Sequence, residues 1–164
     1  MKIHPLLPIV LVTFSLASCS TRREQTLTIN KSVVLRVEAE LWSKGNLAVA
    51  DELYSPDFVC HFVGGQEWRG LPGIKGAVSS HRTSFPDWNE RVDDIIAEGD
   101  RVAIRISSTG TQRGSFMGSP PSGRKVSIQE FHIFRLADGK IVEQWGMPDI
   151  QGLKSQLGAS PTHD

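Results

Sequence analysis

Residues 125–149, which read KVSIQEFHIFRLADGKIVEQWGMPD, carry a histidine and several carboxyl groups on segments rich in apolar residues. Ala137-Asp138-Gly139 is a turn signal, because Asp and Gly tolerate the positive φ of a tight hairpin. If Ala137 pairs with Lys140, the two-residue period of a strand defines one shared face of the hairpin. That face carries Val126, Ile128, Glu130, His132 and Phe134 from the first strand and Ile141, Glu143, Trp145, Met147 and Asp149 from the second.

Ionisable groups on such an apolar face indicate a pocket wall that supports acid and base chemistry, because an unpaired buried charge is costly. A rim position in contact with water is the alternative for Glu130, Glu143 and Asp149. The assignment depends on the register, since a slip of one residue would bring Gln129, Phe131 and Ile133 onto the same face.

The N-terminal segment predicts export. Lys2 precedes an apolar run over residues 6–16, which is too short for a permanent membrane helix and is typical of a signal peptide. Leu16-Ala17-Ser18-Cys19 resembles the lipobox of bacterial lipoproteins, which implies a lipid on Cys19; the alternative is a secretory signal with an incidental cysteine. We expect a signal peptide over residues 1–18, a lipidated polar tether over 19–30, a domain over 31–158 and a tail over 159–164.

The expected location is the cell envelope, anchored on the periplasmic side, with the outer membrane favoured because Ser20 rather than Asp follows the cysteine. Cys60 then has no disulfide partner and is expected to be buried. The 18 basic and 18 acidic residues form no long run of one sign, so nothing indicates nucleic-acid binding. The sequence contains no His-x-x-x-His or Cys-x-x-Cys spacing, so it gives no indication of a metal site.

The hydrophobic pattern predicts helices first and strands after. Helices are expected over residues 31–44, with Asn30 as N-cap and Gly45 as stop, and over 47–54 and 71–84. Strands are expected over 58–63, 92–98, 101–111 and the hairpin, with a loop over 113–124 and a closing helix over 150–157. This order predicts an α+β domain in which a curved antiparallel sheet wraps on three N-terminal helices.

The segments GDRVAIRISSTGTQRGSFMGSPPSGRKV and FRLADGKIVEQWGMPDIQGLKSQLG resemble the SnoaL-like polyketide cyclase (ester cyclase) family over residues 32–158. The resemblance implies a cone-shaped, nuclear-transport-factor-like fold. It also implies an intramolecular aldol condensation that uses no metal or organic cofactor, with a pocket Asp as acid and base. That role falls on Asp149, with His132 on the adjacent strand assisting. Glu130, on the same predicted face, is a further assisting candidate from the residues alone. Two features depart from the family: Gln112 replaces a histidine found in many relatives, and export argues against polyketide tailoring.

Further residues are candidates for the substrate pocket. His61 could enter the pocket or bond to backbone, and His81 is expected at the surface. Phe116 and Met117 lie in the Gly-rich loop, where apolar side chains often cover a cavity mouth. The complete predicted lining is His61, Trp68, Phe116, Met117, Phe134, Glu143, Trp145 and Met147.

Two main functions remain open. The first is a cofactor-free enzyme that acts on a small apolar carbonyl compound. The second is a membrane-tethered protein that binds such a ligand without chemistry. A third possibility is a homodimer formed through the convex face of the sheet.

Overall fold

The computed structural model describes residues 11–62 and 65–158, and only the backbone for residues 11–19. The elements in chain order are α1 (Leu11–Arg36), the π-helix η1 (Val37–Trp42), α2 (Ala48–Leu53), β1 (Tyr54–Phe62), β2 (Glu67–Arg69), α3 (Gly70–Ser84), β3 (Asn89–Glu98), β4 (Arg101–Thr111), β5 (Lys125–Ala137), β6 (Lys140–Pro148) and α4 (Ile150–Leu157).

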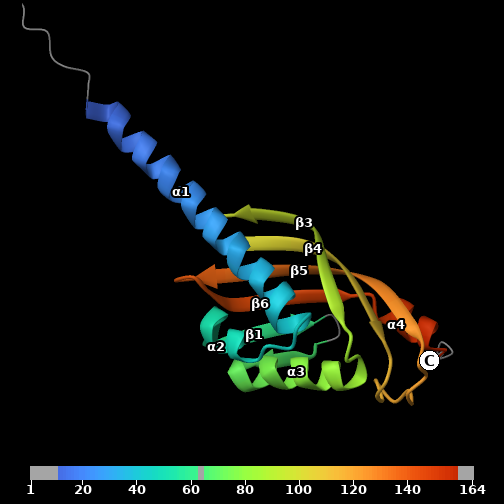
Figure 1. The fold of residues 1–164 in the computed structure, drawn as a ribbon. Helices are drawn as coiled ribbons and strands as arrows, with labels where there is room; N and C mark the ends of the chain where they lie inside the picture. The colour runs from blue at the N-terminus through green and yellow to red at the C-terminus, as the bar shows by residue number, and fades with distance from the viewer. Residues whose placement is uncertain (1–10, 63–64, 159–164) are drawn as a thin grey trace, which may run out of the picture.

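The strands form one curved sheet in the order β2-β1-β6-β5-β4-β3. Neighbouring strands are antiparallel except for β1 and β6, which are parallel. Figure 1 shows α1 crossing one face of this sheet, with α2 and α3 beside β1. The predicted α+β cone is therefore confirmed, with one parallel strand pair that the sequence did not indicate.

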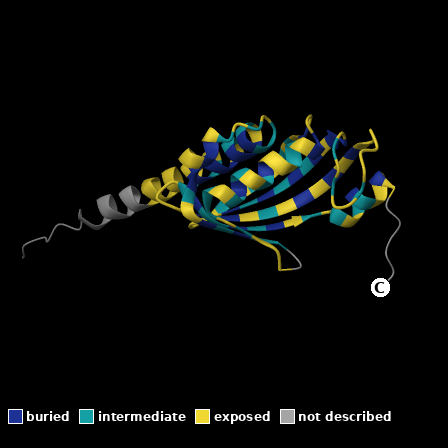
Figure 2. Cartoon of the chain, turned by 90° about the horizontal axis from the view of Figure 1, so that it is seen from below, coloured by how far each residue is buried: buried dark blue, intermediate teal, exposed yellow. Residues whose placement is uncertain are grey.

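The core lies between this concave face and the helices, where dark blue residues of both layers face each other (Figure 2). Val34, Val37 and Leu41 are fully buried at helical spacing and pack against buried side chains of the sheet. The first helix begins earlier than residue 31, so Asn30 lies inside α1 and is buried rather than acting as an N-cap. Helical structure ends at Trp42, and Gly45 follows with a φ of +71°.

The turn of the β5–β6 hairpin is as predicted, but the register beyond it is not. Ala137 pairs with Lys140, and Asp138 and Gly139 have φ values of +50° and +73°. Leu136 then pairs with Ile141, whereas Arg135 pairs with Glu143, so Val142 is an extra residue in β6. Such a bulge exchanges the two faces of the strand that carries it. The predicted face is therefore correct for β5 and wrong for β6 beyond Ile141.

The export signal falls largely outside the described residues. Residues 1–10 and the side chain of Cys19 are not described, and α1 runs through the expected tether. Within residues 11–62 and 65–158, no helix is both long enough and apolar enough to cross a membrane.

Candidate functional site

A line of polar side chains crosses the concave face from β3 to β6. Glu90 on β3 pairs with Ser108 on β4, and Glu130 and His132 follow on β5. His132 is opposite Gly146, and Gln144 lies two residues before it on β6. Because alternate residues of a strand share a face, these groups stand beneath the helices, and Ser108, Glu130 and Gln144 are buried.

Glu130 and His132 form the centre of this line. The Ser108 hydroxyl donates to Glu130 Oε1, and His132 Nε2 lies 3.4 Å from Glu130 Oε2. The Gln144 amide nitrogen is 2.9 Å from His132 Nδ1, so it donates to Nδ1 and leaves the ring proton on Nε2, directed at Glu130. Burial raises the pKa of Glu130, but the hydrogen bonds from His132 and Ser108 outweigh burial and lower it. Glu130 is therefore a buried carboxylate that can accept a proton.

Glu38 and Glu90 are a second pair of carboxyl groups, of which Glu38 is buried and Glu90 is half-buried. Glu38 is buried on the same helical face as Val34, Val37 and Leu41. Burial raises the pKa of Glu38 to about 7, although its hydrogen bond with Glu90 opposes the change. Burial and the charge of Glu38 raise the pKa of Glu90 well above its usual range. Glu38 and Glu90 therefore keep their protons to higher pH than Glu130, whose pKa is lowered.

His81 on α3 faces the interior, which corrects the surface position expected from the sequence. Its ring lies 4.4 Å from that of Trp88 and 5.1 Å from that of Phe85, measured between centroids. Burial lowers the pKa of His81 to about 4, so the imidazole is neutral at neutral pH.

Several buried polar atoms have no hydrogen-bond partner among the residues that the structure describes. They are Tyr54 Oη, His81 Nε2, Glu90 Oε2 and Gln144 Oε1. Buried polar groups without partners are uncommon in folded proteins, and an ordered water, an ion or a bound molecule accounts for them. Their presence on the concave side marks this region as the candidate binding site.

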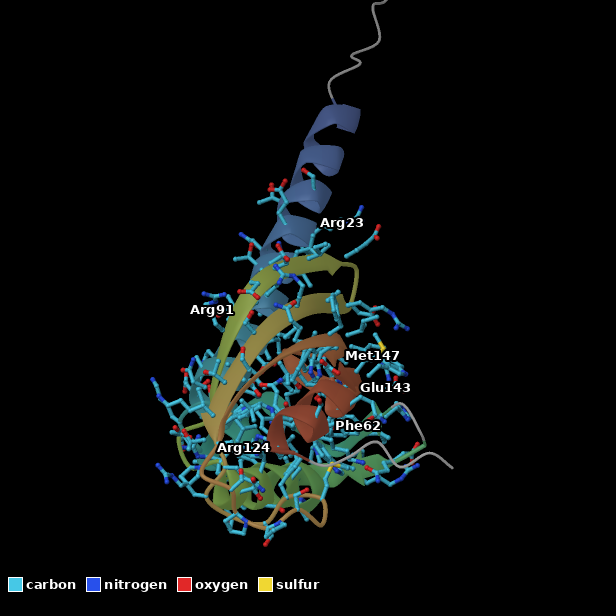
Figure 3. The ribbon with its side chains drawn as sticks, turned by 90° about the vertical axis from the view of Figure 1, so that its right-hand side faces the viewer. Arg23, Phe62, Arg91, Arg124, Glu143 and Met147 are labelled. Atoms are coloured by element: carbon cyan, nitrogen blue, oxygen red, sulfur yellow. The ribbon has the colours of Figure 1, made fainter. Side chains whose placement is uncertain are left out.

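The outer face of the sheet holds several residues predicted for the pocket. His61 contacts Glu67 Oε1 through Nδ1 at 2.9 Å and Glu143 Oε1 through Nε2 at 3.0 Å. The His61 ring stacks on Trp145 with centroids 5.6 Å apart, and Met147 is exposed. Figure 3 shows Glu143 and Met147 on the same side of β6. His61, Glu143, Trp145 and Met147 therefore do not line the concave site, and the bulge at Val142 is the reason for the three residues on β6.

Asp149 is also placed differently from the prediction. Its side chain is exposed and caps the N-terminus of α4, where Oδ1 accepts from the Gly152 amide at 2.8 Å. The expected position in a dry interior is wrong, because the chain leaves the sheet after Pro148 to begin this helix.

The remaining predicted pocket residues divide between two environments. Phe134 is fully buried on the concave face, and Trp68 packs against the same core. Phe116 contacts Phe85 with ring centroids 5.1 Å apart, in a smaller cluster next to His81. Met117 is exposed and does not line this site.

Sequence reasoning missed Glu38, Glu90 and Tyr54. A signal for Glu38 was present, because it lies four residues after Val34 and three before Leu41 and so shares their apolar face. Glu90 and Tyr54 stand next to strand boundaries, and no local pattern pairs either residue with Glu38.

Fold and site define a nuclear-transport-factor-like cone with acidic groups on its concave face. The chain belongs to the SnoaL-like polyketide cyclase family, whose model matches residues 32–157. It is 31% identical over 94 residues to an aklanonic acid methyl ester cyclase of Streptomyces peucetius. That match covers 56% of this chain and 64% of the cyclase, so it spans less than two thirds of the relative.

Two solved structures match this chain over more of its length than the cyclase does. A Jannaschia sp. CCS1 protein assigned to the SnoaL-like polyketide cyclases superposes with a TM-score of 0.77 at 30% identity, covering 83% of this chain and 96% of that one. AclR of Streptomyces galilaeus, assigned as a hydroxylase, gives a TM-score of 0.73 at 32% identity and covers 82% of this chain and 99% of its own. Similar chains are therefore assigned different chemistry, and the activity must be argued from the site.

Proposed function

We propose that this domain catalyses cofactor-free proton transfer at a carbon next to a carbonyl group, in a reaction of the aldol (cyclase), isomerase or lyase type. The substrate is a small apolar carbonyl compound. The observation that carries the proposal is the buried Glu130 carboxylate, which Ser108 and His132 hold in place. Removing a proton from such a carbon requires a base held against it in an apolar environment.

The base in this proposal is Glu130 rather than Asp149. Asp149 is exposed and accepts a hydrogen bond from the first turn of α4, whereas Glu130 is buried among the polar groups of the concave face. His132 supports the reaction by donating from Nε2 to Glu130, which orients that carboxylate, and Gln144 in turn holds the His132 ring through Nδ1. The cyclase activity of the Streptomyces relative supports this type of chemistry.

Hydrogen–deuterium exchange tests the proposal without knowledge of the natural substrate. A panel of small ketones is incubated with the full chain in D₂O, and NMR follows the loss of the signal from protons next to the carbonyl. We expect Glu130→Gln to reduce exchange by about 10²- to 10⁴-fold, the usual contribution of a positioned base. Asp149→Asn is the matched control and should exchange at the wild-type rate. Exchange that survives Glu130→Gln, or that disappears in Asp149→Asn, would contradict the assignment.

A non-catalytic binding protein is the second candidate. The unpartnered Tyr54, His81, Glu90 and Gln144 atoms favour it, because a ligand could satisfy them without any reaction. Native mass spectrometry of the protein from its own host would then show a retained, unmodified ligand. Ketone exchange without a retained ligand supports catalysis instead.

We further propose that a lipid on Cys19 anchors the domain at the periplasmic side of the cell envelope, with the outer membrane favoured. The lipobox-like Leu16-Ala17-Ser18-Cys19 supports this location. Metabolic labelling with an alkyne fatty acid should mark the wild type but not Cys19→Ala. An equal label on both proteins would refute the anchor.

We also propose that the outer face pairs with a second copy of the chain. Phe131, Ile133, Trp145 and Met147 line a shallow apolar groove of about 310 Å³. Charges of both signs flank it, including Glu143 beside Arg135, so the face can complement itself in a two-fold dimer. Light scattering should report a dimer that Phe131→Glu dissociates, and a monomeric wild type would refute the pairing.

A further inference from the structure

The carboxylate of Glu130 is closed off from solvent. Glu130 is 8% exposed, and its hydrogen-bond partner Ser108 is fully buried. A base must come within hydrogen-bonding distance of the proton that it removes. Part of the wall therefore has to move before a ligand reaches Glu130. Two segments cover this end of the concave face, the loop between β4 and β5 and helix α4 (Figure 1).

Strand β5 connects this cover to the base. Val126, Ile128 and Glu130 alternate along the inward face of β5. The two buried leucines of α4, Leu153 and Leu157, lie in one apolar cluster with the first two of these residues. Ile128 is two residues from Glu130, about 7 Å along the strand. The surface under α4 is therefore next to the base.

The loop between β4 and β5 is fixed by buried side chains. The fully buried Gln112 amide donates to the Ser119 carbonyl at 3.3 Å, and its Oε1 accepts from the Ser122 hydroxyl at 2.6 Å. The buried Ser84 hydroxyl, at the end of α3, donates to the Ser115 carbonyl at 2.6 Å. These bonds attach the loop to the core, so it forms a fixed wall.

Helix α4 is attached to β5 by hydrogen bonds at the surface. The exposed Gln156 side chain donates to the Ser127 carbonyl and accepts from the Ser127 amide, both at 2.9 Å. The Arg124 guanidinium donates to the Gln156 carbonyl at 3.1 Å, also at an exposed position. Segments with exposed hydrogen bonds and few buried apolar side chains open at a lower free-energy cost than the core. Of the two covering segments, α4 is therefore the one that can move.

A hinge for this movement lies opposite the base. Strand β6 ends at Pro148, which pairs with Glu130, and the Asp149 amide donates to the Gln129 carbonyl at 3.2 Å. Helix α4 begins at the next residue, Ile150. Rotation at this junction lifts α4 from β5 and leaves the pairing of β5 with β6 intact.

We infer that α4 is a gate that opens as a unit about the Pro148–Asp149 junction and admits a ligand to Glu130. The surfaces that separate carry Leu153, Leu157 and Ile128, so the entrance suits a small apolar compound rather than an ion. The opening does not depend on any chemistry, but its purpose, access to the base, rests on the proposed function.

A thiol placed under the helix measures the opening. Ile128→Cys introduces this thiol, and the native Cys60, fully buried on β1, reports global unfolding in the same molecule. The full chain is treated with methyl methanethiosulfonate, and peptide mass spectrometry follows each thiol. The introduced thiol should react at least about tenfold faster than Cys60, with a weaker dependence on urea, because opening α4 exposes less surface than unfolding. Equal rates and equal urea dependence for the two thiols would overturn the inference.

Variants identify the segment that opens. Gln156→Ala should speed the reaction of the introduced thiol about 5- to 30-fold, the effect of one or two hydrogen bonds. Gln151→Ala, the same change at an exposed position of α4, is the matched control and should stay within about twofold. Ser84→Ala weakens the loop instead and should also leave this rate within about twofold. Acceleration by Ser84→Ala, or none by Gln156→Ala, would assign the opening to another segment and reject the gate.

The wild type provides a test that needs no substitution. Because the Ser127 amide donates to Gln156, it should exchange with solvent in the same opening as the Leu153 amide inside α4. NMR-detected hydrogen exchange should therefore give these two amides the same opening free energy, below that of global unfolding. A Ser127 amide that exchanges only by global unfolding would contradict the gate.

The gate and the proposed catalysis fail separately. Thiol labelling with the expected response to Gln156→Ala, but no deuterium exchange on any ketone, keeps the gate and rejects the catalysis. Ketone exchange that depends on Glu130, with thiol labelling only by global unfolding, keeps the catalysis and rejects the gate.

Discussion

Replacing Glu38 by glutamine should stabilise the fold at and above neutral pH, although it removes a hydrogen-bonded group from the core. Burial raises the pKa of Glu38 from 4.5 to about 7. A carboxyl group with a raised pKa in the folded state favours folding only while it stays protonated, and that contribution is lost as the pH rises toward the folded value. Glutamine has the shape of the protonated acid and does not titrate.

The magnitude follows from the difference between these pKa values. A shift from 4.5 to about 7 corresponds to about 3 kcal/mol of lost stability once the pH is above both values. Between about pH 5 and pH 8, most of this difference should develop, so Glu38→Gln should gain about 2 to 3 kcal/mol over the wild type. Because Glu38 also raises the pKa of Glu90, the substitution should ease ionisation of Glu90 in the same range.

Urea unfolding at a series of pH values, followed by tryptophan fluorescence, measures this difference. The comparison between variant and wild type is needed because His81, whose pKa is lowered by burial, changes the stability of both proteins in the opposite direction. Glu52→Gln is the control, since that exposed carboxyl pairs with Arg36 and its pKa is lowered. A constant difference between Glu38→Gln and the wild type across this range would refute the buried, protonated state of Glu38.

Three further outcomes are expected. Burial lowers the pKa of His81 to about 4, so the free energy of unfolding of the wild type should fall as the pH is lowered from 6.5 to 4. In urea titrations, His81→Phe should abolish about 3 kcal/mol of this decrease. Gly146→Ala should cost about 1 to 3 kcal/mol and slow ketone exchange, because the added Cβ would lie 2.9 Å from the Phe62 ring and 3.2 Å from the His132 ring. Unchanged exchange would show that neither ring has to keep its present position for the reaction. Asp149→Ala should lower stability by about 1 kcal/mol through loss of the α4 cap, with Asp149→Asn closer to the wild type in thermal unfolding.

Local patterns predicted most elements because each leaves a signal in neighbouring residues. Helix α4 was predicted with the bounds that it has, and the hairpin turn formed at Asp138 and Gly139 as expected. The bulge at Val142 left no such signal, and it reversed the faces of the residues that follow it. The predicted face was therefore correct on β5, where Glu130 and His132 face the helices, and wrong on β6 beyond Ile141.

Tertiary contacts account for the rest of what the sequence did not indicate. Glu38, Glu90 and Glu130 come from a helix and two strands that are not neighbours in the sheet, and only the complete fold brings them together. A single acidic residue on an apolar helix face is most simply interpreted as a rim position, so Glu38 gave no indication of its partner. The parallel pairing of β1 with β6, which positions Tyr54, likewise depends on a contact between distant segments.

Ionising the carboxyl groups of Glu38 and Glu90 in the interior lowers the stability of the fold. Burial opposes ionisation of Glu38, Glu90 and Glu130, and only Glu130 has partners that outweigh the cost. If Glu38→Gln is more stable than the wild type at neutral pH, then the ionisable group is not there to hold the core together. Greater stability of Glu38→Gln than of the wild type at neutral pH is therefore the result that this explanation requires.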